Sequence, residues 1–99
     1  MLRSYSGLVN FEWDEAKSLA NSAKHGLSLD KARALWNGPV IVLKSRHPGE
    51  PRQLALGKIG ALHWTIIFTL RGGNIRLISA RRSRDNERNF YDENQRQKS

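Results

Sequence analysis

The stretch LHWTIIFTLRGGNIRLISARR, residues 62–82, decides the fold. In residues 62–70, bulky apolar side chains recur at the two-residue period of a β-strand. One face then carries five large apolar groups that must meet a core: Leu62, Trp64, Ile66, Phe68 and Leu70. The opposite face is only half apolar, so we expect it to stay partly open. RGGN (71–74) is typical of a tight hairpin, and residues 75–80 are expected to form the returning strand.

Two helical segments are expected before this hairpin. Asp14 is suited to begin the first as its N-cap, and Gly26 is suited to end it. Its apolar residues recur at helical spacing and are expected to pack closely against the rest of the chain: Ala16, Leu19, Ala20 and Ala23. The second helix lies within residues 27–39, with Ser28 as its N-cap, and Gly38-Pro39 ends it.

Further elements flank the hairpin. Residues 40–43 form a continuous apolar run that predicts a strand buried on both faces, and residues 53–56 predict the next strand. Ser83 is expected to cap a last helix from Arg84 to about Gln95, and residues 94–99 are expected to fray.

The order of elements predicts an α+β fold with a single domain over residues 1–99. It comprises two N-terminal helices, a three- to four-stranded, mainly antiparallel sheet and a C-terminal helix, with the helices on one side of the sheet. Residues 1–10 have no helical period and are expected to form a loose extension or a short edge strand that ends at Phe11.

Composition limits the classes of function. The chain has 99 residues and no cysteine, which excludes disulfides and thiol chemistry. No apolar run approaches the roughly 18 residues of a membrane span, and the start lacks a signal-peptide pattern, so we expect a cytoplasmic protein. The net charge of +8, with 17 Lys and Arg against nine Asp and Glu, favours a polyanionic partner such as nucleic acid.

Three arginines stand where the returning strand gives way to the last helix: Arg81, Arg82 and Arg84. Successive strand residues point to opposite faces, so Arg81 and Arg82 cannot share one face. Together with the positive N-terminal end of the helix, the arginines could form a phosphate cradle. Alternatively, they pair with neighbouring carboxylates such as Asp85, Glu87, Asp92 and Glu93.

Histidines are the first candidates for proton transfer. His25 follows Lys24 at the end of the first helix, where cations also act simply as capping charges. His63 lies on the half-polar face of the 62–70 strand, pointing away from the predicted core, although a lone strand histidine is often structural.

Other candidates lie elsewhere in the chain. Glu50 and Arg52 are either an ion pair or a general base beside a phosphate anchor, and Tyr91 is a packing aromatic or a proton donor. The spacing of carboxylates and histidines fits no metal site, and there is no phosphate-binding glycine motif. Any phosphate chemistry is therefore expected to need no metal, with arginines stabilising charge instead.

Three segments together resemble the BrnT family of type II toxins: FEWDEAKSLANSAKHGLSLDKARALW, EPRQLALG and HWTIIFTLRGGNIRLISARRSRDNERNFYDE. The likeness covers residues 11–93, with residues 1–10 as an extension. It implies a RelE-like fold and a metal-independent endoribonuclease toxin that cuts RNA and arrests growth. It also implies a BrnA-type antitoxin that neutralises the toxin and whose DNA-binding part represses the operon.

The resemblance and the chemistry together give a set of candidate residues. The catalytic candidates are Lys24, His25, Glu50, Arg52, His63, Arg81, Arg82 and Tyr91. The further RNA-binding candidates are Arg71, Arg76, Arg84 and Arg88. In the expected reaction the RNA 2′-hydroxyl attacks the adjacent phosphate, leaving a 2′,3′-cyclic phosphate. A regulator that binds nucleic acid without cutting it, or a subunit that only binds an antitoxin, are the alternatives.

Overall fold

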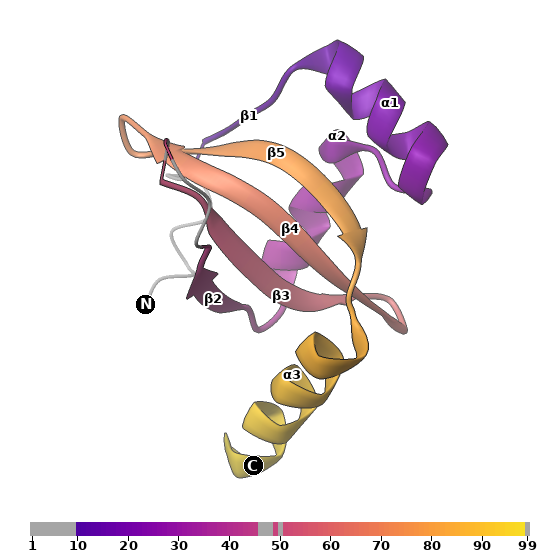
Figure 1. Ribbon diagram of the computed structural model, residues 1–99, viewed down its shortest axis with the longest axis vertical. Coiled ribbons are helices and arrows are strands. Elements are labelled where there is room, and N and C mark those ends of the chain that lie inside the picture. The colour runs from indigo at the N-terminus through magenta and orange to yellow at the C-terminus, as the bar shows by residue number, and fades with distance from the viewer. Residues whose placement is uncertain (1–9, 46–48, 50, 99) are drawn as a thin grey trace.

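The computed structural model describes residues 10–45, 49 and 51–98. The sheet strands are β1 (Phe11–Glu12), β2 (Ile41–Lys44), β3 (Gln53–Ile59), β4 (Leu62–Arg71) and β5 (Asn74–Arg82). The helices are α1 (Glu15–His25), α2 (Leu29–Ala32), which continues as a 3₁₀ helix over Arg33–Asn37, and α3 (Asp85–Lys98). The expected α+β class is confirmed (Figure 1).

The sheet has five strands in the order β1-β5-β4-β3-β2. Four of them form an antiparallel meander, and β1 adds a parallel pairing in which Phe11 lies beside Ile75. The sheet is therefore mixed and larger than the three to four strands that we predicted. A short edge strand ending at Phe11 was one of our two expectations for the start of the chain; β1 includes Phe11 and continues to Glu12, and residues 1–9 lie outside the described residues.

The central hairpin has the predicted form. Gly72 and Gly73 both have positive φ angles, +58° and +87°, which is the geometry of a type I′ turn between the paired residues Arg71 and Asn74. A residue with a Cβ atom would strain both turn positions. The two-residue alternation of side chains along β4 also holds in the centre of the strand. The pairing of β4 with β5 shifts in register between Ile67 and Phe68.

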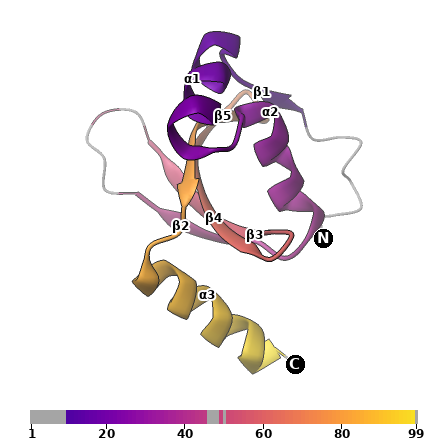
Figure 2. The ribbon, with the colours of Figure 1, turned by 90° about the vertical axis from the view of Figure 1, so that its right-hand side faces the viewer.

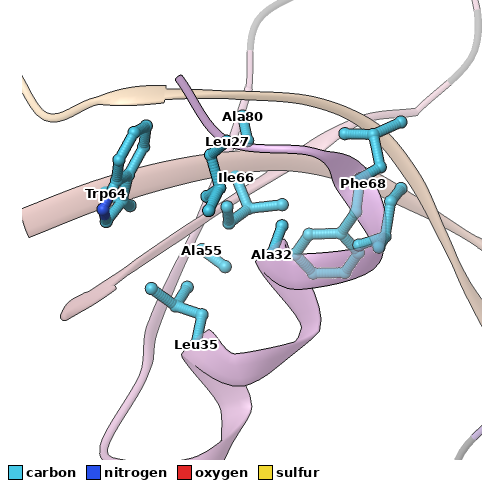
Figure 3. Close-up of a cluster of buried hydrophobic side chains, with 10 residues drawn as sticks. Leu27, Ala32, Leu35, Ala55, Trp64, Ile66, Phe68 and Ala80 are labelled. Atoms are coloured by element: carbon cyan, nitrogen blue, oxygen red, sulfur yellow. The ribbon is translucent and has the colours of Figure 1, made fainter. Parts of the chain in front are cut away.

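One apolar core lies between the sheet and the α2 segment (Figure 3). From β4, Trp64, Ile66 and Phe68 enter it as predicted, whereas Leu62 and Leu70 at the strand ends are exposed. The helical side supplies Leu27, Leu29, Ala32 and Leu35, all buried. Ser28 caps α2, since its hydroxyl accepts a hydrogen bond from the Lys31 amide at 3.1 Å.

Helix α1 has the predicted ends but buries a different face from the one that we predicted. Asp14 accepts from the Lys17 amide, and Gly26 adopts a φ of +85°. The apolar stripe that we expected to pack is exposed, with Leu19 67% accessible. The buried residues are instead Ser18 and Asn21, whose side chains hydrogen-bond backbone groups of α2 and β5. Hydrogen bonding to the edge of β5 therefore decided the orientation of the helix.

Helix α3 lies on the face of the sheet opposite to α1 and α2 (Figure 2). Its contacts go to His63 and Thr65, which point away from the core. We expected all helices to lie on one side of the sheet and the opposite face to stay partly open. Both expectations are wrong over the part of the sheet that α3 covers. The helix continues to Lys98, through most of the segment that we expected to fray.

Strand β2 differs from the prediction in burial. We expected residues 40–43 to be buried on both faces, but β2 is an edge strand whose burial alternates, and Val42 is 47% exposed. An unbroken apolar run cannot by itself distinguish a central strand from an edge strand with one buried face.

Gly57 on β3 offers a test of the packing between the sheet and the helical layer. A Cβ atom added there would lie 2.8 Å from Cγ of Leu35, whose side chain is fully buried. We expect Gly57→Ala to lower the free energy of unfolding by about 1–3 kcal/mol through this clash. Gly38→Ala is the control, because its Cβ would meet nothing within 4 Å. Equal stability of both variants, measured by urea denaturation, would contradict this packing.

Candidate active site between β4 and α3

The structure separates the candidate residues into three groups. Arg52, Arg71 and Arg76 lie toward the hairpin end of the sheet, and Arg76 pairs with Glu12 at 3.2 Å. Thr69, whose hydroxyl donates to the Pro51 carbonyl, marks this end. Thr69 is six positions along β4 from His63, a span of about 20 Å. Arg52 therefore cannot share one phosphate with His63, and Glu50 lies outside the described residues.

The second group is Lys24 and His25, at the C-terminal end of α1. Asn21, one turn earlier, donates to the Ala80 carbonyl and accepts from the Ala80 amide, which holds α1 along the edge of β5. No hydrogen bond or ion pair within the described part of the chain links Lys24 or His25 to the residues facing α3. The geometry does not bring them together with His63.

The third group surrounds the start of α3 and is organised by Glu87. Its carboxylate accepts two hydrogen bonds from the Arg81 guanidinium at 2.8 and 2.9 Å, one from Thr65 at 2.9 Å and one from the Arg84 amide at 2.8 Å. This last bond caps the helix, a role that we had assigned to Ser83. The Ser83 hydroxyl instead lies 2.9 Å from the hydroxyl of Thr65.

Competing influences act on the Glu87 carboxylate. Burial is the largest and acts to raise its pKa, but the hydrogen bonds from Arg81, Arg84 and Thr65 together lower the pKa to about 2. The charged carboxylate is thus part of the folded structure. For Arg81, the alternative of pairing with a neighbouring carboxylate describes the structure, because both of its terminal nitrogens donate to Glu87.

The remaining arginines of this run diverge. Arg82 lies on the opposite face to Arg81, as the strand period predicted, and its guanidinium carbon is 5.7 Å from the centre of the Trp64 ring. The Arg84 side chain is exposed, and Arg88 pairs with Asp85 at 2.8 Å on the surface of α3. A single cradle that holds all these cations is not formed.

His63 makes the contact best suited to proton transfer. Its Nε2 lies 2.7 Å from Oδ1 of Asp92, on α3, and its side chain is 14% exposed. The hydrogen bond from His63 is the largest influence on the pKa of Asp92 and lowers it; burial acts to raise the pKa, and nearby cations lower it further. A charged carboxylate can only accept, so Nε2 carries the proton of this hydrogen bond. In the neutral imidazole this hydrogen bond leaves the lone pair on Nδ1, the arrangement that a general base needs.

Tyr91 supports this histidine from the side. Its ring stands edge-on to His63 at a centroid distance of 5.8 Å, and its hydroxyl donates to the Pro39 carbonyl at 2.9 Å. Burial, and then the charge of Asp92, raises the pKa of Tyr91. Because its proton is already donated to Pro39, the geometry favours packing over proton transfer for this residue.

Asp92 is a candidate residue that sequence reasoning missed, since we had named it only as a partner for arginines. It is 29 positions from His63 in the chain, and nothing local marks the pair. Within the described residues, no group of three or more His, Asp or Glu side chains could hold a metal ion. Nor is any helix there long and apolar enough to cross a membrane.

Comparison with known proteins assigns the family. The sequence model of a family described as "Ribonuclease toxin, BrnT, of type II toxin-antitoxin system" matches residues 13–87, most of the chain. The chain belongs to the BrnT family. Among curated proteins, none matches it. The BrnT match includes His63, Arg81 and Glu87, whereas Tyr91 and Asp92 lie just beyond it.

The Glu87 cluster predicts a specific dependence of stability on pH. Because its folded pKa of about 2 is below the ordinary 4.5, Glu87 stabilises the fold fully above pH 4.5, and this contribution is lost as the pH falls toward 2. We expect Glu87→Gln to lower the free energy of unfolding near pH 7 by about 2–3 kcal/mol and to remove this pH dependence.

Asp85→Asn is the control for this measurement, because Asp85 is on the same helix but 88% exposed in its pair with Arg88. Its effect should stay within about 0.5 kcal/mol. Urea unfolding at a series of pH values would decide the matter, and parallel pH curves for the wild type and Glu87→Gln would refute the assignment.

Proposed function

We propose that this protein is a metal-independent endoribonuclease in which His63 takes the proton from the RNA 2′-hydroxyl. The observation that carries the proposal is the 2.7 Å hydrogen bond between His63 Nε2 and Asp92. It fixes the imidazole in the tautomer whose Nδ1 can accept a proton. In keeping with the BrnT family, the protein would act in the cytoplasm as a toxin whose RNA cleavage inhibits translation and growth.

The proposed reaction conserves atoms and charge. The 2′-oxygen forms a bond to the adjacent phosphorus while its proton moves to Nδ1 of His63. The bond from phosphorus to the 5′-oxygen then breaks, and the departing oxygen takes up a proton from a water molecule; the hydroxide left behind is neutralised when the imidazolium of His63 gives up its proton. The products are a 2′,3′-cyclic phosphate and a 5′-hydroxyl, and the imidazolium formed on His63 is stabilised by the carboxylate of Asp92.

A cognate antitoxin is part of the same proposal. A BrnA-type protein would neutralise the toxin and, through its own DNA-binding part, attach the complex to operator DNA. The family description supports an antitoxin partner in general. The excess of cations on this chain favours acidic segments in that partner.

The two histidine candidates can be distinguished by substitution. We expect His63→Gln to reduce the rate of RNA cleavage by about 10²–10⁴-fold, the usual contribution of general acid–base catalysis. The assay is single-turnover cleavage of total RNA in EDTA, with product ends identified by chemistry. If His25→Gln lost the activity and His63→Gln kept it, the assignment would be wrong. Products ending in a 3′-hydroxyl would exclude the 2′-hydroxyl route.

Asp92 acts through His63 as a positioning residue. Asn at this position can donate to Nε2, which favours the wrong tautomer, so we expect Asp92→Asn to lower kcat by roughly 10- to 10³-fold with little change in KM. Asp30→Asn removes an equivalent exposed charge from α2, on the other side of the sheet, and should leave kcat unchanged. RNA that binds the wild-type protein and stays intact would favour the non-catalytic alternative.

A further inference from the structure

A hollow of about 390 Å³ lies directly beside His63 and has no role in the chemistry described so far. It is lined by Lys58, Tyr91, Asp92, Gln95 and Arg96. The first of these comes from β3 and the other four from α3. Lys58 is the cross-strand partner of His63, and Asp92 is its hydrogen-bond acceptor, so two neighbours of His63 line the hollow.

Gln95, which lines the hollow, carries an unpaired hydrogen-bond donor. Its Nε2 is buried yet donates no hydrogen bond within the described residues. Leaving a buried donor unpaired is unfavourable, and native proteins contain few such groups. Because the amide nitrogen itself is buried, the Gln95 side chain must turn toward the hollow to reach a bound molecule, whose acceptor oxygen or nitrogen would then satisfy it.

Lys58 and Arg96 give the hollow its positive character. Both are close enough to Asp92 to lower the pKa of its carboxyl, after the larger effect of the hydrogen bond from His63. Arg96 also pairs with Glu93, but both side chains are more than half exposed, and such surface pairs exchange easily. The Lys58 side chain is exposed. An anionic group can therefore approach both cations from solvent.

We propose that this hollow binds the single-stranded RNA segment that flanks the scissile phosphate. Lys58 and Arg96 hold its backbone phosphates, and Gln95 donates to an acceptor on a base or a ribose. The inference rests on the proposed function for its placement beside the cleaved bond. A single strand fits better than a duplex, because unpaired nucleotides expose to a side-chain amide the Watson–Crick edges that base pairing hides.

Binding can be measured apart from cleavage with a fluorescein-labelled 2′-O-methyl RNA 12-mer of mixed sequence, which lacks the attacking hydroxyl. We expect Lys58→Gln and Arg96→Gln each to weaken binding about 3- to 10-fold, and to lower the slope of log K against log salt by about 0.7. Lys31→Gln is the matched control, since it removes an exposed cation from α2 on the opposite face. An equal loss in all three variants would overturn the proposal.

Gln95→Leu gives an independent readout. It removes the unpaired donor, so the melting temperature should stay the same or rise, while affinity for the 12-mer falls about 3- to 10-fold. Unchanged affinity would exclude a role for Gln95 in binding. If these variants bind normally while His63→Gln loses cleavage, the subsite fails and the proposed function stands. If they lose binding but the wild type never cleaves RNA, the subsite stands and the proposed function fails.

Discussion

The buried carboxylate of Glu87 is the interaction on which the placement of α3 depends. It joins a side chain of β4, a guanidinium of β5 and the first backbone amide of the helix. Removing one partner of such a cluster leaves an uncompensated charge, so the three elements are held as a unit. Helical geometry then extends this constraint along α3. Tyr91 and Gln95 follow Glu87 at intervals of four residues and lie on the same side of the helix, toward the sheet and the hollow.

A polar attachment of this kind explains why the sequence predicted some features better than others. The hairpin turn, the N-caps of α1 and α2, and the three central core residues of β4 depend on local spacing, and the structure confirms them, although Leu62 and Leu70 at the ends of β4 are exposed. The orientation of α1 depends on Asn21, which bonds Ala80 59 positions away. Two polar residues determined which side of α1 is buried, against an apolar stripe that would have predicted the opposite. Such a long-range preference leaves no periodic signal.

The same reasoning applies to the site. Arginines in a row suggested one cradle, but strand alternation sends Arg82 to the other face, and Glu87 engages Arg81. His63 was identified from its place on the strand, whereas its partner Asp92 was not, because nothing in the sequence tells which turn of α3 meets β4. Burial of a carboxylate at Glu87 sets that meeting point. A residue that reads as one of several surface charges thus determines the chemistry of its neighbours.

The family match ends between Glu87, which fixes the start of α3, and Asp92, whose position depends on it. Residues 13–87 include His63 and the whole Glu87 cluster but stop before Asp92. The position of Asp92 still follows from the matched segment. A helix that begins at Asp85 and is fixed at Glu87 places Asp92 five residues further along, where it meets His63 of β4. The carboxylate on His63 and the lining of the hollow are therefore set by the geometry of a segment that precedes them. Substitutions in the last turns of α3 would then change the lining of the hollow while the fold and the position of His63 stay the same.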